Sequence, residues 1–345
     1  MKPRVAINGF GRIGKMVMRC NLVRDLLDIV AINDTSGTDI HSHLLKFDST
    51  YGILPNEVSH DDANLIVDGV KIPMYCNRDP GQLPWKKHEV DIVIECTGVF
   101  TDREGASKHL TAGAKRVLIS APGKNPDATF VRGVNCDSFD PQKHFIVSNA
   151  SCTTNCLAPL AKVLDEIFEI EHGFMTTIHS YTNDQVILDS AHKDPRRARS
   201  AQLSLIPTST GAAKAIGEVL PHLAGKLNGI AVRAPTPTVS IVDLVCNVKR
   251  APKDAAEVNA ALKRAAAGHL KGILALEDRP LVSVDFRHNH YSSIVDTALT
   301  MVAGNMIKTF SWYDNEWGYS MRTVELAAKM AGADNAGVCI LFPLC

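Results

Sequence analysis

Residues 4–14 of the chain read Arg4-Val5-Ala6-Ile7-Asn8-Gly9-Phe10-Gly11-Arg12-Ile13-Gly14, and this stretch decides the fold. Its apolar start predicts a strand over residues 4–8, and apolar residues at helical spacing between 16 and 23 predict a helix after the last glycine. The glycines have the G-x-G-x-x-G spacing, which permits a tight turn and lets a pyrophosphate approach a helix N-terminus. The stretch therefore predicts the strand, turn and helix of a Rossmann dinucleotide-binding domain.

A carboxylate follows the next predicted strand. Residues 28–33 are largely apolar and lead to Asp34, about twenty residues beyond the glycines, where an acidic residue accepts hydrogen bonds from an adenosine ribose. The alternative is that Asp34 only begins the turn at Ser36-Gly37. Further strands predicted over 91–95 and 116–119, with a helix over 104–109 between them, continue the doubly wound pattern. We therefore assign residues 1–150 to one dinucleotide-binding domain.

The second half of the chain has a different pattern. Looser alternation predicts strands over residues 173–180, 230–233, 239–248, 281–286, 298–302 and 307–312, and helices over 211–220 and 254–267. Runs of strands with separate helices indicate an α+β domain with a mostly antiparallel sheet, which we place at residues 151–314. A last helix over 321–330 is expected to return to the first domain, so residues 315–345 are assigned to that domain.

Composition narrows the class of protein. The 345 residues carry 37 Lys plus Arg and 37 Asp plus Glu, so we expect no nucleic acid partner. The apolar runs are too short to cross a bilayer, and the start of the chain leads directly into a strand, which favours a soluble protein. Nine cysteines without paired spacing fit reduced thiols, so we expect a cytoplasmic location. The pair Cys152 and Cys156 has no companion pair at ligand spacing, so we expect no metal.

One cysteine lies where a strand passes into a helix. A short strand is predicted over 144–147, and apolar residues at helical spacing begin just after Cys152. The N–H groups of a helix start stabilise a thiolate, so we interpret Cys152 as a nucleophile rather than as a core residue. Its base is expected to be a histidine on a rigid element, and His179 ends a predicted strand before a polar loop.

Four runs of residues together resemble the phosphorylating glyceraldehyde-3-phosphate dehydrogenase family. They are Ile7 to Gly14, Ala150 to Cys156, Thr208 to Ala215 and Ser311 to Ser320, and the resemblance extends over about residues 3–330. It implies oxidation of glyceraldehyde 3-phosphate to 1,3-bisphosphoglycerate through a thiohemiacetal and a thioester on Cys152, with His179 as the base. The family is homotetrameric, and the loop from about Ser180 to Gln202 resembles one that lines a neighbouring subunit's cofactor site.

The resemblance also assigns binding residues. By this resemblance, the substrate phosphate is bound by Thr182, Arg197 and Arg233. The attacking inorganic phosphate is bound by Ser151, Thr153, Thr210 and Gly211. Guanidinium groups, hydroxyls and the N–H of a helix start suit two anions. The cofactor, NAD, falls to Gly9, Gly11, Arg12, Ile13, Gly14, Asp34, Thr35, Arg78, Ser120, Asn315 and Tyr319. Asn315 would hold the nicotinamide carboxamide, and Tyr319 would pack against the ring.

Two departures from the family pattern bear on the cofactor. Thr35 stands where strictly NAD-using relatives carry a leucine, and Ser190-Ala191 replaces the usual Leu-Pro. Both changes resemble the photosynthetic, NADP-accepting branch, in which hydroxyls and a cation such as Arg78 receive the 2′-phosphate. We therefore expect NADP to be used alongside NAD, although Asp34 would repel the phosphate unless it moved away. The alternative is neutral drift at a NAD-only site.

Other interpretations remain open at this point. Erythrose-4-phosphate dehydrogenase shares the cysteine and histidine, but the run Thr210-Gly211 favours the phosphorylating enzyme. A non-enzymatic, NAD-bound regulator is the rival from another class. The tail carries Cys339 and Cys345, which suggest a redox latch, with packing or disorder as the alternatives.

Overall fold

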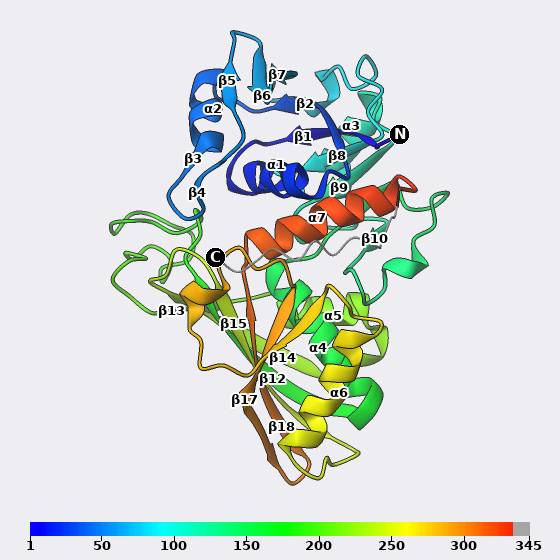
Figure 1. The fold of residues 1–345 in the computed structure, drawn as a ribbon, viewed down its shortest axis with the longest axis vertical. Coiled ribbons are helices and arrows are strands. Elements are labelled where there is room, and N and C mark those ends of the chain that lie inside the picture. The colour runs from blue at the N-terminus through cyan, green and yellow to red at the C-terminus, as the bar shows by residue number, and fades with distance from the viewer. Residues whose placement is uncertain (334–345) are drawn as a thin grey trace.

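The computed structural model describes residues 1–333, which form two sheet-based units that meet along a C-terminal helix (Figure 1). The predicted tail pair, Cys339 and Cys345, lies outside the described residues. The fold class expected from the sequence, a Rossmann domain joined to an α+β domain, is confirmed by the two sheets described below.

The first unit is a nine-stranded sheet. Its strand order is β10 (Ala128–Thr129), β11 (Ile146–Ser148), β9 (Arg116–Ile119), β8 (Ile92–Glu95), β1 (Arg4–Asn8), β2 (Asp28–Asn33), β7 (Val70–Tyr75), β6 (Asn64–Val67) and β5 (Val58–His60). Pairing is parallel from β10 to β7 and antiparallel at β6 and β5. The helices are α1 (Arg12–Arg24), α2 (Thr38–Lys46) and α3 (Arg103–Thr111), and β3 (Phe47–Asp48) pairs with β4 (Gly52–Ile53) apart from this sheet.

The strand order reverses beside β1. The chain leaves β1 for β2 on one side, and later continues from β8 to β9 and β11 on the other side. Ligands bind at such a switch point, outside the carboxyl ends of the strands. The glycine-rich turn begins with Gly9, directly after β1, so the sheet topology places it at the expected crevice.

The second unit is a seven-stranded sheet. Its order is β13 (Ile206–Ser209), β14 (Leu227–Ala234), β12 (Ile170–Ser180), β15 (Ser240–Val248), β18 (Met306–Tyr313), β17 (Ser293–Ala303) and β16 (Leu274–Glu277). The β12–β14 and β16–β17 pairs are parallel and the other four are antiparallel, as expected of a mostly antiparallel sheet. Helices α4 (Cys152–Phe168), α5 (Ala212–Val219) and α6 (Ala255–Ala267) belong to this unit.

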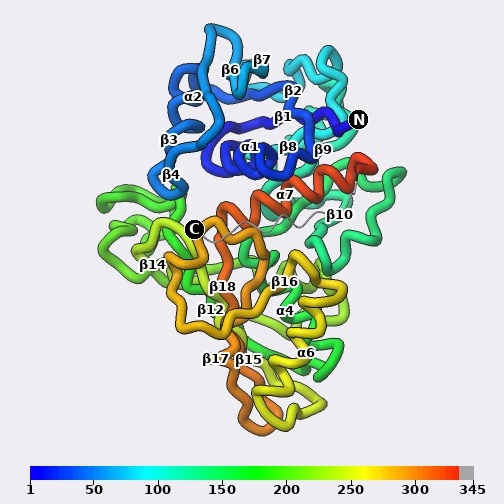
Figure 2. Tube along the Cα trace, in the orientation of Figure 1, coloured from blue at the N-terminus to red at the C-terminus, as the bar shows by residue number. Residues whose placement is uncertain are grey.

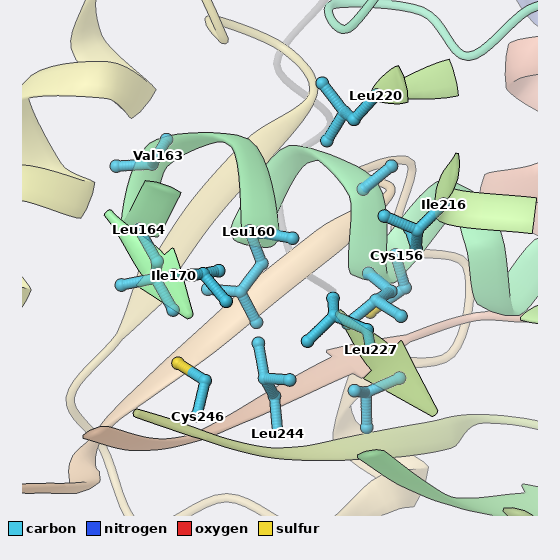
Figure 3. Packing of buried hydrophobic residues seen from close by; sticks show 14 of the residues in the cluster. Cys156, Leu160, Val163, Leu164, Ile170, Ile216, Leu220, Leu227, Leu244 and Cys246 are labelled. Carbon is cyan, nitrogen blue, oxygen red and sulfur yellow. The ribbon is translucent and has the colours of Figure 1, made fainter. Parts of the chain in front are cut away.

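The largest buried cluster lies between α4 and this sheet (Figure 3). Leu160 and Leu164 of α4 pack toward Leu244 and Cys246 of β15. Burying these side chains is the main source of stability for this unit, at about 25 cal/mol for each Å² of apolar surface. The helix that begins at Cys152 is thereby anchored in the core.

The last helix, α7 (Trp317–Met330), packs on the first unit. Met321 and Val324 share a buried cluster with Met16 and Val17 of α1, and the chain trace shows α7 along the boundary between the two units (Figure 2). This helix begins at Trp317 rather than at residue 321, because the amide N–H groups of Glu316 and Trp317 are bonded by the Asp314 carboxylate.

One predicted strand is wrong. Residues 283–286 form a 3-10 turn instead, because Asp285 accepts a hydrogen bond from the Val282 N–H at 2.8 Å. Such a local bond competes with a strand ladder. Within residues 1–333 no helix is long and apolar enough to cross a membrane.

Candidate active site

A strained turn leads into the helix that carries Cys152. Strand β11 ends at Ser148, and Ala150 then adopts a left-handed conformation with φ of 54°, which costs energy for a residue with a Cβ. The turn is fixed by hydrogen bonds from the Ala150 N–H to Ser148 Oγ (3.0 Å) and from the Tyr319 hydroxyl to the Ala150 carbonyl (3.0 Å). Ser151 caps the helix, since its Oγ accepts from the Thr154 N–H at 3.0 Å.

The histidine predicted as the base faces the cysteine. His179 Nε2 lies 3.4 Å from Cys152 Sγ. His179 is near the end of β12, and its register partner on the parallel strand β14 is Arg233. A cation is therefore placed beside the imidazole by strand pairing itself. Arg233 Nη1 lies 2.5 Å from His179 Nδ1 and donates to the Ser180 carbonyl at 3.0 Å.

The other side of the ring sets its protonation. His179 Nδ1 also lies 2.7 Å from the Ser180 carbonyl oxygen, which accepts its proton in one tautomer. In that tautomer Nε2 is bare and faces the Cys152 sulfur, as a base must. Arginine has no acceptor, so Arg233 and the ring N–H compete for the same carbonyl. Movement of Arg233 away from the ring would favour the tautomer that accepts the thiol proton.

The pair is neutral in this state. Burial, and then the charge of Arg233, lower the pKa of His179 to about 3. Burial raises the pKa of the Cys152 thiol, although Arg233 and the hydrogen bonds of Thr153 act in the opposite direction. The start of a helix was expected to stabilise a thiolate here, and desolvation outweighs that effect before any ligand is bound.

The residues expected at the attacking phosphate lie at two helix starts. Ser151 and Thr153 begin α4, and the Thr153 hydroxyl is bonded to the Tyr313 hydroxyl at 2.8 Å. Thr210 and Gly211 precede α5, whose N-cap is Gly211 without a side-chain cap. A Cβ at Gly211 would meet no atom within 4 Å, so its backbone is open to a ligand.

The cations expected at the substrate phosphate are close enough to affect one another. Burial, with repulsion from Arg197 among the other causes, lowers the pKa of Arg233. Arg197 donates to Thr208 Oγ1 at 2.9 Å and pairs with Asp184. An incoming phosphate would compete with this carboxylate. Thr182, the third expected residue, follows β12 in the same loop and its carbonyl accepts from the Gln185 N–H at 2.9 Å.

The glycine-rich turn has the shape that a pyrophosphate needs. Gly9 has a φ of 91°, and a Cβ on Gly14 would lie 2.2 Å from the Gly9 carbonyl oxygen. A Cβ on Gly11, by contrast, would meet nothing within 4 Å, so the turn is tight on its protein side and open on its outer side. Helix α1 follows Gly11 with no side-chain cap, which leaves its N–H groups available to an anion. These residues fit a dinucleotide. Ile13, in the first turn of α1, packs against the first unit's core.

Arg12 and Asp34 are both engaged by protein partners. Arg12 pairs with Glu316, which precedes α7, and with Asp48. Asp34 Oδ2 accepts from the Phe10 N–H at 2.7 Å. Burial opposes its ionisation, but the contact with His41 and the hydrogen bond from the Phe10 N–H lower the pKa of Asp34 to about 2.

The remaining expected cofactor residues fall into two groups. Thr35 and Arg78 are exposed, whereas Ser120 follows β9 and its hydroxyl donates to the Glu95 carbonyl at 2.9 Å. Asn315 is buried, and its Oδ1 accepts from Ser180 Oγ at 2.9 Å and Ser240 Oγ at 3.1 Å. These bonds fix the orientation of the amide, so its NH₂ group is the part that remains to donate to a ligand.

Sequence reasoning missed several side chains around this site. His41 contacts Asp34, and Lys15 in turn contacts His41. Separately, the Tyr51 hydroxyl donates to the buried carboxylate of Asp314 at 2.7 Å. Asp314 also bonds the N–H groups that begin α7. A histidine inside a helix gives no local signal of such a role, since its partners are distant in the sequence.

The fold and the site define an NAD-binding oxidoreductase that presents a cysteine paired with a histidine. Residues 3–103 match the NAD binding domain of the glyceraldehyde 3-phosphate dehydrogenase family, and residues 151–315 match its C-terminal domain. The chain belongs to this family. It is 57% identical to the glyceraldehyde-3-phosphate dehydrogenase of Geobacillus stearothermophilus over 332 residues, covering 96% of this chain and 99% of that protein.

Chloroplastic relatives are about as similar. The chain is 58% identical over 334 residues to the chloroplastic glyceraldehyde-3-phosphate dehydrogenase GAPA1 of Arabidopsis thaliana, covering 96% of this chain and 84% of that protein. It is also 58% identical over 331 residues to glyceraldehyde-3-phosphate dehydrogenase A, chloroplastic, of Zea mays, covering 94% and 82%. The resemblance found in the four sequence runs is confirmed.

Proposed function

We propose that the protein oxidises glyceraldehyde 3-phosphate to 1,3-bisphosphoglycerate, with NAD as the electron acceptor and inorganic phosphate as the second substrate. The observation that supports this most directly is the 3.4 Å approach of His179 Nε2 to Cys152 Sγ at the start of α4. A base at this distance takes the thiol proton as sulfur attacks an aldehyde carbon. The reaction is proposed to be reversible, because the acyl group stays activated, first as a thioester and then as an acyl phosphate.

The residues act in sequence. Cys152 forms a carbon–sulfur bond with the aldehyde carbon as His179 takes the thiol proton, and His179 then gives this proton to the carbonyl oxygen to complete the thiohemiacetal. Neutral again, His179 takes the proton of the thiohemiacetal hydroxyl as hydride leaves that carbon. The bound nicotinamide supplies the hydride acceptor. The product is a thioester on Cys152. Inorganic phosphate, held at the N-termini of α4 and α5 by Ser151, Thr153, Thr210 and Gly211, attacks the thioester carbon and the thiolate departs.

The substrate phosphate is proposed to engage Arg233, Arg197 and Thr182. Arg233 is also the cation that lowers the pKa of His179. When a phosphate draws Arg233 toward itself, the imidazole loses a repulsive neighbour and becomes a stronger base. Substrate binding and activation of the base are in this way linked through one guanidinium group.

The cofactor is proposed to lie along the first unit. Gly9, Gly11 and Gly14 shape the pyrophosphate turn, with Arg12 and Ile13 beginning the helix behind it. Asp34 receives the ribose, Ser120 borders the crevice, and Asn315 and Tyr319 hold the nicotinamide. NADP would be accepted alongside NAD through exposed Thr35 and Arg78. We place the division between the domains at residues 150 and 315, with the described residues 315–333 in the first; the rest of the predicted segment, to residue 345, lies outside the described residues.

The test is a phosphate-dependent assay with glyceraldehyde 3-phosphate, run separately with NAD and NADP. We expect turnover to require inorganic phosphate and to be lost in Cys152→Ala. Turnover of erythrose 4-phosphate without phosphate would favour the related dehydrogenase, and an inactive protein that binds NAD would favour a regulator. If kcat/KM with NADP is at least about a thousandfold lower than with NAD, a difference of about 4 kcal/mol, the proposed use of NADP is contradicted.

We also propose a homotetramer in the cytoplasm. Seven cysteines within the described residues are free, which supports a reducing compartment. The seven-stranded sheet exposes large apolar side chains on the face away from its helices, as Phe174 is 69% exposed, Ile230 50% and Met301 53%. An exposed apolar face of this kind marks a site of association.

A further inference from the structure

Four residues form a closed chain of contacts behind the ribose end of the cofactor site. Lys15 of α1 and His41 of α2 are only 6% and 4% exposed. Lys15 Nζ donates to the Phe10 carbonyl and lies 3.0 Å from His41 Nδ1. His41 Nε2 lies 3.1 Å from Asp34 Oδ1. Asp34 Oδ2 accepts from the Phe10 N–H at 2.7 Å, so the chain begins and ends on Phe10 in the glycine-rich turn.

The contacts fix the tautomer of His41. A lysine ammonium has donors only, so Nδ1 of His41 must accept from Lys15. The imidazole is then neutral, and its proton is on Nε2, which faces Asp34. The Nε2–Oδ1 contact is not aligned as a full hydrogen bond, so the neutral ring attracts the carboxylate mainly through the dipole of its N–H group. The ring also packs edge-on against Phe10, with 5.5 Å between centroids, which limits its rotation.

The consequence is a carboxylate that is held in place. Asp34 is contacted by His41, by the Phe10 N–H and by the Ser36 N–H at 3.1 Å. An ionised carboxylate accepts hydrogen bonds from the 2′-hydroxyl of NAD, and it repels the doubly charged 2′-phosphate of NADP. The repulsion is avoided only if the side chain rotates away, and rotation would break these contacts.

We propose that His41 is a positioning residue that makes the ribose site prefer a 2′-hydroxyl over a 2′-phosphate by restraining Asp34. The proposal rests on the proposed function for the identity of the cofactor. It adds that a buried residue acting through Asp34 sets how strongly NADP is disfavoured.

The test is calorimetric binding of NAD and of NADP to the full-length protein and two variants. In His41→Asn the shorter amide can still accept from Lys15 but stops short of Asp34, whereas the amide of His41→Gln reaches it. We expect His41→Asn to lower the ratio of the NADP and NAD dissociation constants about tenfold, and His41→Gln to keep the wild-type ratio within about twofold. His43→Asn, on the same helix but exposed, is the control and should leave the ratio unchanged.

A second comparison shows whether His41 acts through Asp34. In an Asp34→Gly background, His41→Asn should change the ratio by less than about twofold, because no carboxylate remains to restrain. A full shift there, or no shift in the His41→Asn single variant, would overturn the proposal. If thermal denaturation shows that His41→Asn is unfolded, Lys15→Met provides the test, since loss of the ammonium also frees the ring. Wild-type protein that binds neither nucleotide would instead contradict the proposed function.

Discussion

His179 stands beside a cation and is buried, and both conditions keep its imidazole neutral with a pKa of about 3. A base is active when unprotonated, so a low pKa preserves the base as the pH falls. We expect kcat/KM, which reports the free enzyme, to stay level down to about pH 5 instead of falling near the ordinary histidine pKa of about 6.5. The measurement is the second-order rate constant of thioester formation, obtained by rapid mixing with substrate well below KM across this pH range.

His179→Asn is the matched variant for this experiment, because its amide retains much of the shape and cannot take a proton. The rate should fall about 10²- to 10⁴-fold, without a pH-dependent limb. A wild-type limb near the ordinary pKa that is absent in His179→Asn would show that the imidazole titrates normally and would contradict the expectation.

Cys152 should react selectively with an anionic reagent. Its thiol pKa is raised by burial, but Arg233 lies close by and attracts anions. Iodoacetate is charged and iodoacetamide is not, so we expect their rate ratio to be several-fold higher at Cys152 than at exposed Cys76, by about 1 kcal/mol of attraction. Mass spectrometry of partly labelled protein at low salt gives both rates. Equal rate ratios at the two cysteines, or labelling spread evenly over all nine, would contradict the attraction of the anionic reagent to Cys152.

At the scale of elements, two helices begin with the same kind of cap but differ in what lies beside it. Ser151 Oγ accepts from the Thr154 N–H and Asp254 Oδ1 from the Glu257 N–H, both at 3.0 Å. Ser151→Ala and Asp254→Ala should each cost about 1 kcal/mol of unfolding free energy in urea titrations. Only Ser151→Ala should also raise the KM for inorganic phosphate. A similar KM change in both variants would remove Ser151 from the phosphate site.

The elements were predictable where local signals agreed. Strands β1 and β2 and the start of α4 at Cys152 follow from apolar periodicity and flanking turn residues. The strand predicted at residues 281–286 is absent because a carboxylate at Asp285 bonds its own turn. Strand β13 was missed, since it is short and contains Pro207, and α2 has no capping side chain to mark its start.

The site was predictable in part. Cys152 has a local signal in its sequence, whereas His179 is supported mainly by the family resemblance. The closeness of Arg233 to His179 depends on strand register between β12 and β14, which no short stretch of sequence specifies. The partners of Asp34 come from α1 and α2, so His41 could be connected to the ribose site only by the tertiary structure.

At the scale of the whole molecule, the exposed face of the seven-stranded sheet should control assembly. The register of β12, β15, β18 and β17 aligns Phe174 with Val245, then with Lys308 and Met301, so these residues share one face. Phe174→Asp should shift the molecular mass measured by light scattering from a tetramer toward smaller species. Val70→Asp, at an exposed apolar residue of the first unit, is the control. An unchanged mass in Phe174→Asp would place the interface elsewhere.

Helix α4 carries two thiols one turn apart with opposite surroundings. Cys152 is only partly buried, at the edge of the core, while Cys156 is fully buried in the core and burial raises its pKa to about 12. Reagents can reach the second sulfur only when the core itself opens. The two thiols therefore report on two different events in one experiment. The rate at which a reagent modifies Cys152 measures access to the native site, and the rate at which it modifies Cys156 measures opening of the core.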